Sequence, residues 1–70
     1  MSDLGQNAGG NSLYRFLQPG QSDGETQQLG DDATAENYAR QLSTTQSAPI
    51  IIERRDHVDW EYVTEVDERP

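Results

Sequence analysis

The sequence predicts an α+β fold, a two-layer ββαββ domain in which one amphipathic helix packs on a small, mostly antiparallel four-stranded sheet. Three observations support this prediction. Residues 30–42 carry apolar side chains at helical spacing, residues 50–52 are three consecutive isoleucines, and residues 60–66 alternate large uncharged side chains with mostly acidic ones. The first pattern indicates a helix buried along one face, whereas β-branched runs and a period of two are typical of strands.

The chain is expected to divide into three parts. Residues 1–11 hold three glycines, two asparagines and few apolar side chains, which predicts a flexible N-terminal tail. Residues 12–67 form the single small domain, and residues 68–70 are expected to fray. A chain of 70 residues without cysteine is close to the size at which one core barely suffices, so marginal stability or self-association follows.

The first part of the domain predicts a β-hairpin. Residues 12–18 are rich in aromatic and aliphatic side chains and stop at Pro19, which is typical of a strand followed by a turn. Residues 19–24 are turn formers, and residues 25–29 are a short polar segment of the kind that often forms an edge strand.

The helix is expected to begin after Gly30, with Asp31 or Asp32 capping the free N–H groups of its first turn. Its buried face is formed by residues at positions i, i+3, i+4 and i+7. These residues are Ala35, Tyr38, Ala39 and Leu42. Residues 43–48 are polar and lack a period, so we expect the helix to fray within them and a loop to follow.

Residues 50–54 and 60–66 predict the last two strands. If the third strand lies beside the second, the two are parallel and the crossover is right-handed; if it lies beside the first, that pair is antiparallel. The sequence leaves both arrangements open. The predicted core joins the helix face to one side of the sheet. Its sheet residues are Tyr14, Phe16, Leu29, Ile50, Ile52, Trp60, Tyr62 and Val66.

The opposite side of the sheet has no second predicted helix to cover it and is the candidate interaction surface. Its members are Leu13, Arg15, Leu17, Ile51, Glu53, Arg55, Glu61 and Val63, with Glu65 on the same side. One interpretation is an ordinary surface whose apolar residues are shielded by arginine stems. The other is a surface for association, which a small chain without disulfides or metal would gain from burying.

Thirteen acidic residues against five arginines and no lysine give a net charge of −8. A surface of this sign repels phosphate, so we expect no direct binding of nucleic acid. Two explanations of this acidity are possible. The preferred one is solubility, including in a cytoplasm of high salt concentration; the more specific one is that the acidic residues bind a basic surface on a partner protein. No apolar run approaches the roughly 18 residues of a membrane span, and no secretory signal is recognisable, so the expected location is cytoplasmic without membrane contact.

Catalytic chemistry has little support in the sequence. Cysteine and lysine are absent, and His57 is the single imidazole. With Asp56, Asp59 and Glu61 it could hold a divalent cation or act as a base. The spacing matches no zinc signature, however, and a solvated turn is the preferred interpretation. We therefore expect no catalytic residue, no cofactor and no metal.

These observations favour a small acidic, non-enzymatic protein-interaction or regulatory module, as a monomer or a homodimer. It would act through the open side of its sheet and through an acidic rim, meaning the carboxylates of the turns, helix start and last strand. The alternative is an acidic inhibitor or nucleic-acid mimic that occupies a basic groove of a partner protein. A mimic needs carboxylates in rows at phosphate-like spacing, and their spread along this sequence favours the first function.

Overall fold

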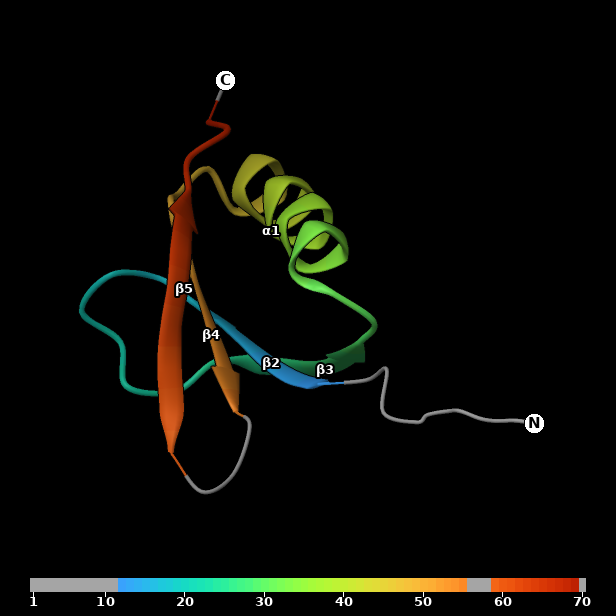
Figure 1. Cartoon of the computed structure of the whole chain (residues 1–70). Coiled ribbons are helices and arrows are strands. Elements are labelled where there is room, and N and C mark those ends of the chain that lie inside the picture. Colours follow the sequence, from blue (N-terminus) through green and yellow to red (C-terminus); the bar gives the residue numbers. More distant parts are fainter. Residues whose placement is uncertain (1–11, 56–58, 70) are drawn as a thin grey trace.

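The computed structural model describes residues 12–55 and 59–69, and Figure 1 shows one helix lying over one side of a sheet. The elements are β2 (Ser12–Leu17), β3 (Glu25–Leu29), α1 (Asp32–Gln46), β4 (Ile50–Arg55) and β5 (Trp60–Val66). This order and layering confirm the predicted ββαββ fold of the α+β class. The predicted tail over residues 1–11 lies outside the described residues, as do residues 56–58 of the predicted turn.

The sheet has the strand order β3-β2-β4-β5, and every neighbouring pair is antiparallel. The third strand along the chain therefore lies beside the first, which settles the choice that the sequence left open. The short polar strand β3 lies at one edge, as predicted, and β5 lies at the other.

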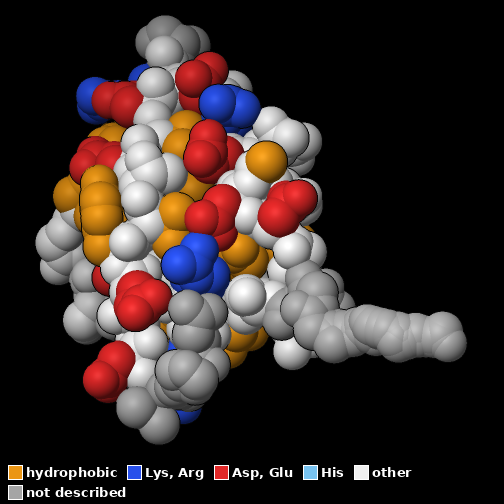
Figure 2. All heavy atoms as spheres, in the orientation of Figure 1, with side chains coloured by type: hydrophobic (Ala, Val, Ile, Leu, Met, Phe, Trp, Pro, Cys, Tyr) orange, Lys and Arg blue, Asp and Glu red, His pale blue; other side chains and the backbone are white. Residues whose placement is uncertain are grey.

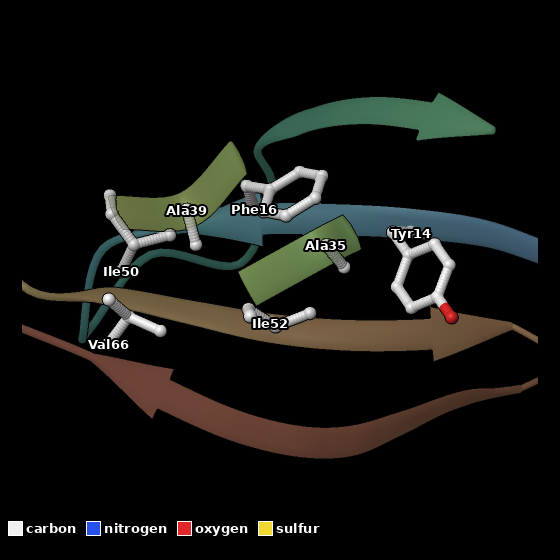
Figure 3. Close-up of a cluster of buried hydrophobic side chains, with 7 residues drawn as sticks. All are labelled: Tyr14, Phe16, Ala35, Ala39, Ile50, Ile52 and Val66. Atoms are coloured by element: carbon white, nitrogen blue, oxygen red, sulfur yellow. The ribbon is translucent and has the colours of Figure 1, made fainter. Parts of the chain in front are cut away.

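The core fills the space between α1 and one side of the sheet (Figure 3). It is formed by Tyr14, Phe16, Ala35, Ala39, Ile50, Ile52 and Val66. The two alanines are completely buried, and their small side chains allow the helix to lie close to the strands. Four partly buried residues pack at the margin of this core, namely Leu29, Tyr38, Leu42 and Val63.

The start of the helix follows the prediction. Asp31 is the N-cap, and its side chain accepts a hydrogen bond of 2.8 Å from the backbone N–H of Thr34. Asp32 adds a negative charge in the first turn, where the helix dipole is positive. In the described part of the chain, no helix is long and apolar enough to span a bilayer.

The helix ends at Gln46, within residues 43–48 as predicted, and a short connection leads to β4. Ser43 stands four residues after Ala39 and is completely buried on the same face. Its hydroxyl donates to the carbonyl of Ala48 at 2.7 Å and accepts from the backbone N–H of Glu68 at 2.8 Å. These bonds hold the end of the helix, a role of Ser43 that the sequence did not indicate. Residue 68 was expected to fray; its N–H and carbonyl are bonded to the helix, since the carbonyl accepts from the Thr44 hydroxyl.

A β-bulge interrupts the pairing of β5 with β4. Ile52 lies opposite Thr64 and Glu53 lies opposite Tyr62, which leaves Val63 without a partner residue on β4. Because a bulge adds one residue to the strand, the side chains that precede it point to the opposite side of the sheet from the one that regular alternation predicts. The prediction that Trp60 and Tyr62 face the helix was therefore wrong, because both residues lie on the opposite side of the sheet. Val63 packs against the core instead.

Candidate interaction surface

We call the side of the sheet that faces away from α1 the open face. Strand alternation and the pairing registers place eleven residues on it. They are Leu13, Arg15 and Leu17 of β2, Thr26 and Gln28 of β3, Ile51, Glu53 and Arg55 of β4, and Trp60, Tyr62 and Glu65 of β5. Within the described ranges no helix covers this face. Most of the predicted surface is brought together here, except Glu61 and Val63, which the bulge turns to the helix side.

Arg15 organises the middle of the open face. It lies directly opposite Glu53 in the register of β2 and β4. Its Nε donates to Glu53 Oε1 at 2.9 Å, and its Nη2 donates to the same oxygen. The guanidinium carbon also lies 4.4 Å from the centroid of the Trp60 ring, within the range of a cation–π contact. Because the Arg15 and Glu53 side chains are only 18% and 23% exposed, their ion pair is partly shielded from water.

Tyr62 is the large apolar side chain most open to solvent on this surface, with 67% of its area exposed. Three further apolar side chains of the open face are half-buried: Trp60 on the same strand, Ile51 on the neighbouring strand β4, and Leu13 on β2. The apolar part of the open face is therefore discontinuous and framed by charged residues. Sequence reasoning missed both aromatic residues, because the sequence carries no sign of the bulge that exposes them.

Leu17 lies on the open face by alternation but is only 5% exposed, and it is not part of the core under the helix. The connection from β2 to β3, residues 18–24, runs on the side of the sheet away from α1 (Figure 1). A Cβ added at Gly24 would lie 2.9 Å from Leu17 Cβ and 2.1 Å from the Phe16 carbonyl oxygen, which shows how closely this connection approaches β2. We therefore leave Leu17 out of the contact surface, although the sequence predicted it as a member.

Acidic side chains are scattered among apolar and uncharged ones in Figure 2 and do not form a row in this view. Several of them accept strong hydrogen bonds. A bond from Tyr38 lowers the pKa of Glu25, and a bond from Arg69 lowers the pKa of Asp67. Glu25 and Asp67 are therefore ionised at neutral pH.

The first turn of α1 is tied to the sheet by a polar cluster that the sequence did not reveal. The buried Tyr14 hydroxyl donates to Asp32 Oδ1 at 2.6 Å, and Arg54 Nη1 donates to both oxygens of Asp32 at 2.7 and 2.8 Å. Arg54 Nη2 lies 3.8 Å from Glu61 Oε1. Strand order brings Tyr14 and Arg54 side by side, which local sequence patterns cannot show.

Burial, followed by the bond to Asp32, raises the pKa of Tyr14 to about 12. The bond from Tyr14, followed by that from Arg54, lowers the pKa of Asp32. A phenol that stays protonated and a carboxylate that stays ionised make a stable hydrogen bond at neutral pH, but neither group is poised to exchange a proton there. The cluster is therefore a structural link between the helix and three strands.

No group of three potential metal ligands occurs in residues 12–55 and 59–69. The histidine-containing turn considered for a cation lies partly outside these residues, with only Asp59 and Glu61 described.

Comparisons of this chain with protein-family models, curated proteins and solved structures found no match.

Proposed function

We propose that this chain is a small, non-enzymatic protein-interaction module that binds a protein partner, or a second copy of itself, through the open face. The exposed aromatic ring of Tyr62 is the observation that carries the proposal. It stands on a sheet surface that no described helix covers and that also carries three half-buried apolar residues, Leu13, Ile51 and Trp60. Apolar side chains framed by polar ones are typical of interaction sites.

The residue types on this surface support the same function. Tryptophan, tyrosine and arginine supply most of the binding energy in many protein interfaces. Arg15 is already held by Glu53 and by the Trp60 ring, so binding a partner would cost little of its side-chain entropy. The shortage of nucleophiles and of histidine supports the non-enzymatic part of the proposal. The absence of cysteine supports a cytoplasmic location.

The acidic inhibitor or nucleic-acid mimic is less well supported. Ion pairs engage many of the carboxylates with arginines, as in Arg15 with Glu53 and Arg69 with Asp67. A mimic depends on free, regularly spaced negative charges, because these compete with phosphates for a basic groove.

The test places a carboxylate in the middle of the open face with Ile51→Glu. Buried against an apolar partner, an unpaired carboxylate costs several kcal/mol, so binding should weaken by a factor of about a hundred or more. Gln41→Glu adds the same charge on the exposed surface of α1 and is the matched control. Circular dichroism verifies that both variants fold.

Sedimentation velocity at several protein concentrations detects self-association. A pull-down with the immobilised protein detects binding partners. We expect Ile51→Glu to abolish self-association or the capture of a partner that Gln41→Glu retains. A monomeric wild type whose partners all bind Ile51→Glu normally would contradict the proposal.

A further inference from the structure

We propose that the outer edge of β5 is a second recognition site, which takes an extended, positively charged segment of a partner protein as an added antiparallel or parallel strand. The inference rests on the proposed function in treating the chain as an interaction module. It uses the edge of β5, which adjoins the open face at Tyr62 and Glu65, and its test measures strand pairing at that edge.

The first support is the position of β5 in the sheet. In the described part of the chain, β4 is its one hydrogen-bonded neighbour. A terminal strand directs the N–H and C=O groups of alternate residues away from the sheet, and these groups can pair with another extended chain. β5 is the longest strand, with seven residues against five in β3, so it offers the longer template.

The second support is charge. β5 contains Glu61 and Glu65, and Asp59, Asp67 and Glu68 flank it. The Glu61 side chain is 61% exposed, and Glu65 is exposed as well. Arg69 is paired with Asp67, and Arg54 is bonded to Asp32 and lies 3.8 Å from Glu61. These two arginines are outnumbered by the five carboxylates in and beside β5, so the edge keeps an excess of negative charge. An added strand with lysine or arginine residues complements this excess.

The bulge determines which faces of the added strand need positive charge. Glu61 lies on the helix side of β5 and Glu65 lies on the open face. Successive side chains of a strand alternate between these two sides, so basic residues of the partner can meet a carboxylate on either one. Tyr62, exposed on the open face, offers its ring to a cation of the same partner.

The same charges disfavour a second copy of the chain at this edge. Antiparallel pairing of two β5 strands about Val63 would place Glu61 of one opposite Glu65 of the other at both ends. Like charges directly opposite each other destabilise a strand pair. The other edge of the sheet is a poorer site for a basic segment, because β3 is shorter and carries one carboxylate, Glu25, against two in β5.

The test uses the full chain and three synthetic peptides long enough to span β5. The first repeats arginine-arginine-valine-valine, which places arginines on both faces of an added strand. The second has the same sequence with N-methyl groups on the backbone amides of one edge, and the third replaces arginine by glutamate. Two-dimensional NMR of the isotope-labelled protein at physiological salt measures affinity and amide protection. We expect the first peptide to bind and to protect alternate β5 amides. We expect the N-methylated peptide to bind at least about tenfold more weakly because it loses strand pairing, and the acidic peptide not to bind.

Charge variants complete the test. Glu61→Gln and Glu65→Gln should each weaken binding by about two- to fivefold, the effect of one exposed ion pair. Glu36→Gln, on α1 beside Arg40, is the matched control and should leave the affinity unchanged. Absence of binding by the basic peptide, equal binding of its N-methylated form, or protection confined to β3 would each overturn the inference. Ile51→Glu adds a carboxylate opposite Glu65, so it should bind the basic peptide at least as tightly as the wild type does while it loses binding through the open face. A failure of the open-face proposal is therefore distinguishable from a failure of this one.

Discussion

Replacing Tyr14 by phenylalanine should remove a defined part of the pH dependence of stability. Burial and the bond to Asp32 raise the pKa of Tyr14 from 10.0 to about 12 in the folded chain. The protonated phenol therefore stabilises the native state fully below pH 10, and this contribution is lost as the pH rises towards 12. With about 1.4 kcal/mol for each pKa unit, the loss amounts to roughly 2–3 kcal/mol.

Urea unfolding at pH values from about 8 to 12, followed by the fluorescence of the single tryptophan, Trp60, measures this loss. Over this range the free energy of unfolding of the wild type should fall by roughly 2 kcal/mol more than that of Tyr14→Phe, since the native phenol is half ionised at the upper end of the range. Near neutral pH the variant should be less stable by about 1–2 kcal/mol, because it lacks one hydrogen bond to a charged group. Tyr62→Phe, which removes a hydroxyl from a side chain that is 67% exposed, is the matched control and should behave as the wild type does.

Parallel curves for wild type and Tyr14→Phe would refute the reasoning. They would mean that the Tyr14 hydroxyl ionises as easily in the native state as in the unfolded chain. The bond to Asp32, and with it the link between the helix start and β2, would then be absent in solution.

Three further changes test the packing. Tyr38→Ala should cost about 2–4 kcal/mol in urea unfolding, because the Tyr38 ring packs edge-on against Phe16 with a centroid distance of 4.9 Å; a native-like transition would contradict this contact. Gly24→Ala should cost roughly 1–3 kcal/mol and lower the melting temperature measured by circular dichroism, since the added Cβ would lie 2.1 Å from the Phe16 carbonyl oxygen. Ser43→Ala should cost about 1–3 kcal/mol and speed hydrogen exchange at the Glu68 amide, which loses its acceptor; unchanged exchange would show that this bond does not form in solution.

Local signals in the sequence were sufficient to predict the elements of this fold. The isoleucines at 50–52 resist helix and form β4, and an aspartate after Gly30 caps α1 as expected. The helix ends within residues 43–48 as expected, but the burial of Ser43 was missed because it is polar and its bonding partners, Ala48 and Glu68, are supplied by the folded chain. A buried serine with satisfied bonds has no local signature.

The candidate surface was predictable only where strand alternation is regular. Arg15 and Glu53 were placed on one side of the sheet, and they form an ion pair there. Trp60 was placed on the wrong side, because the alternation of residues 60–66 is unbroken in sequence and the irregularity lies in their pairing with β4. A pairing irregularity depends on two strands at once, which no pattern within one strand can report.

The bulge at Val63 also determines how substitutions in β5 should be interpreted across related sequences. The two largest side chains of β5, Trp60 and Tyr62, are not members of the core. The packing under the helix therefore does not restrict which residues can replace them. Val63, an unremarkable residue in sequence, does pack against that core. If relatives keep an aromatic residue at the exposed position 62, selection for binding is the explanation. An aromatic residue kept at 60 also preserves the contact with Arg15, and an apolar residue kept at 63 reflects folding.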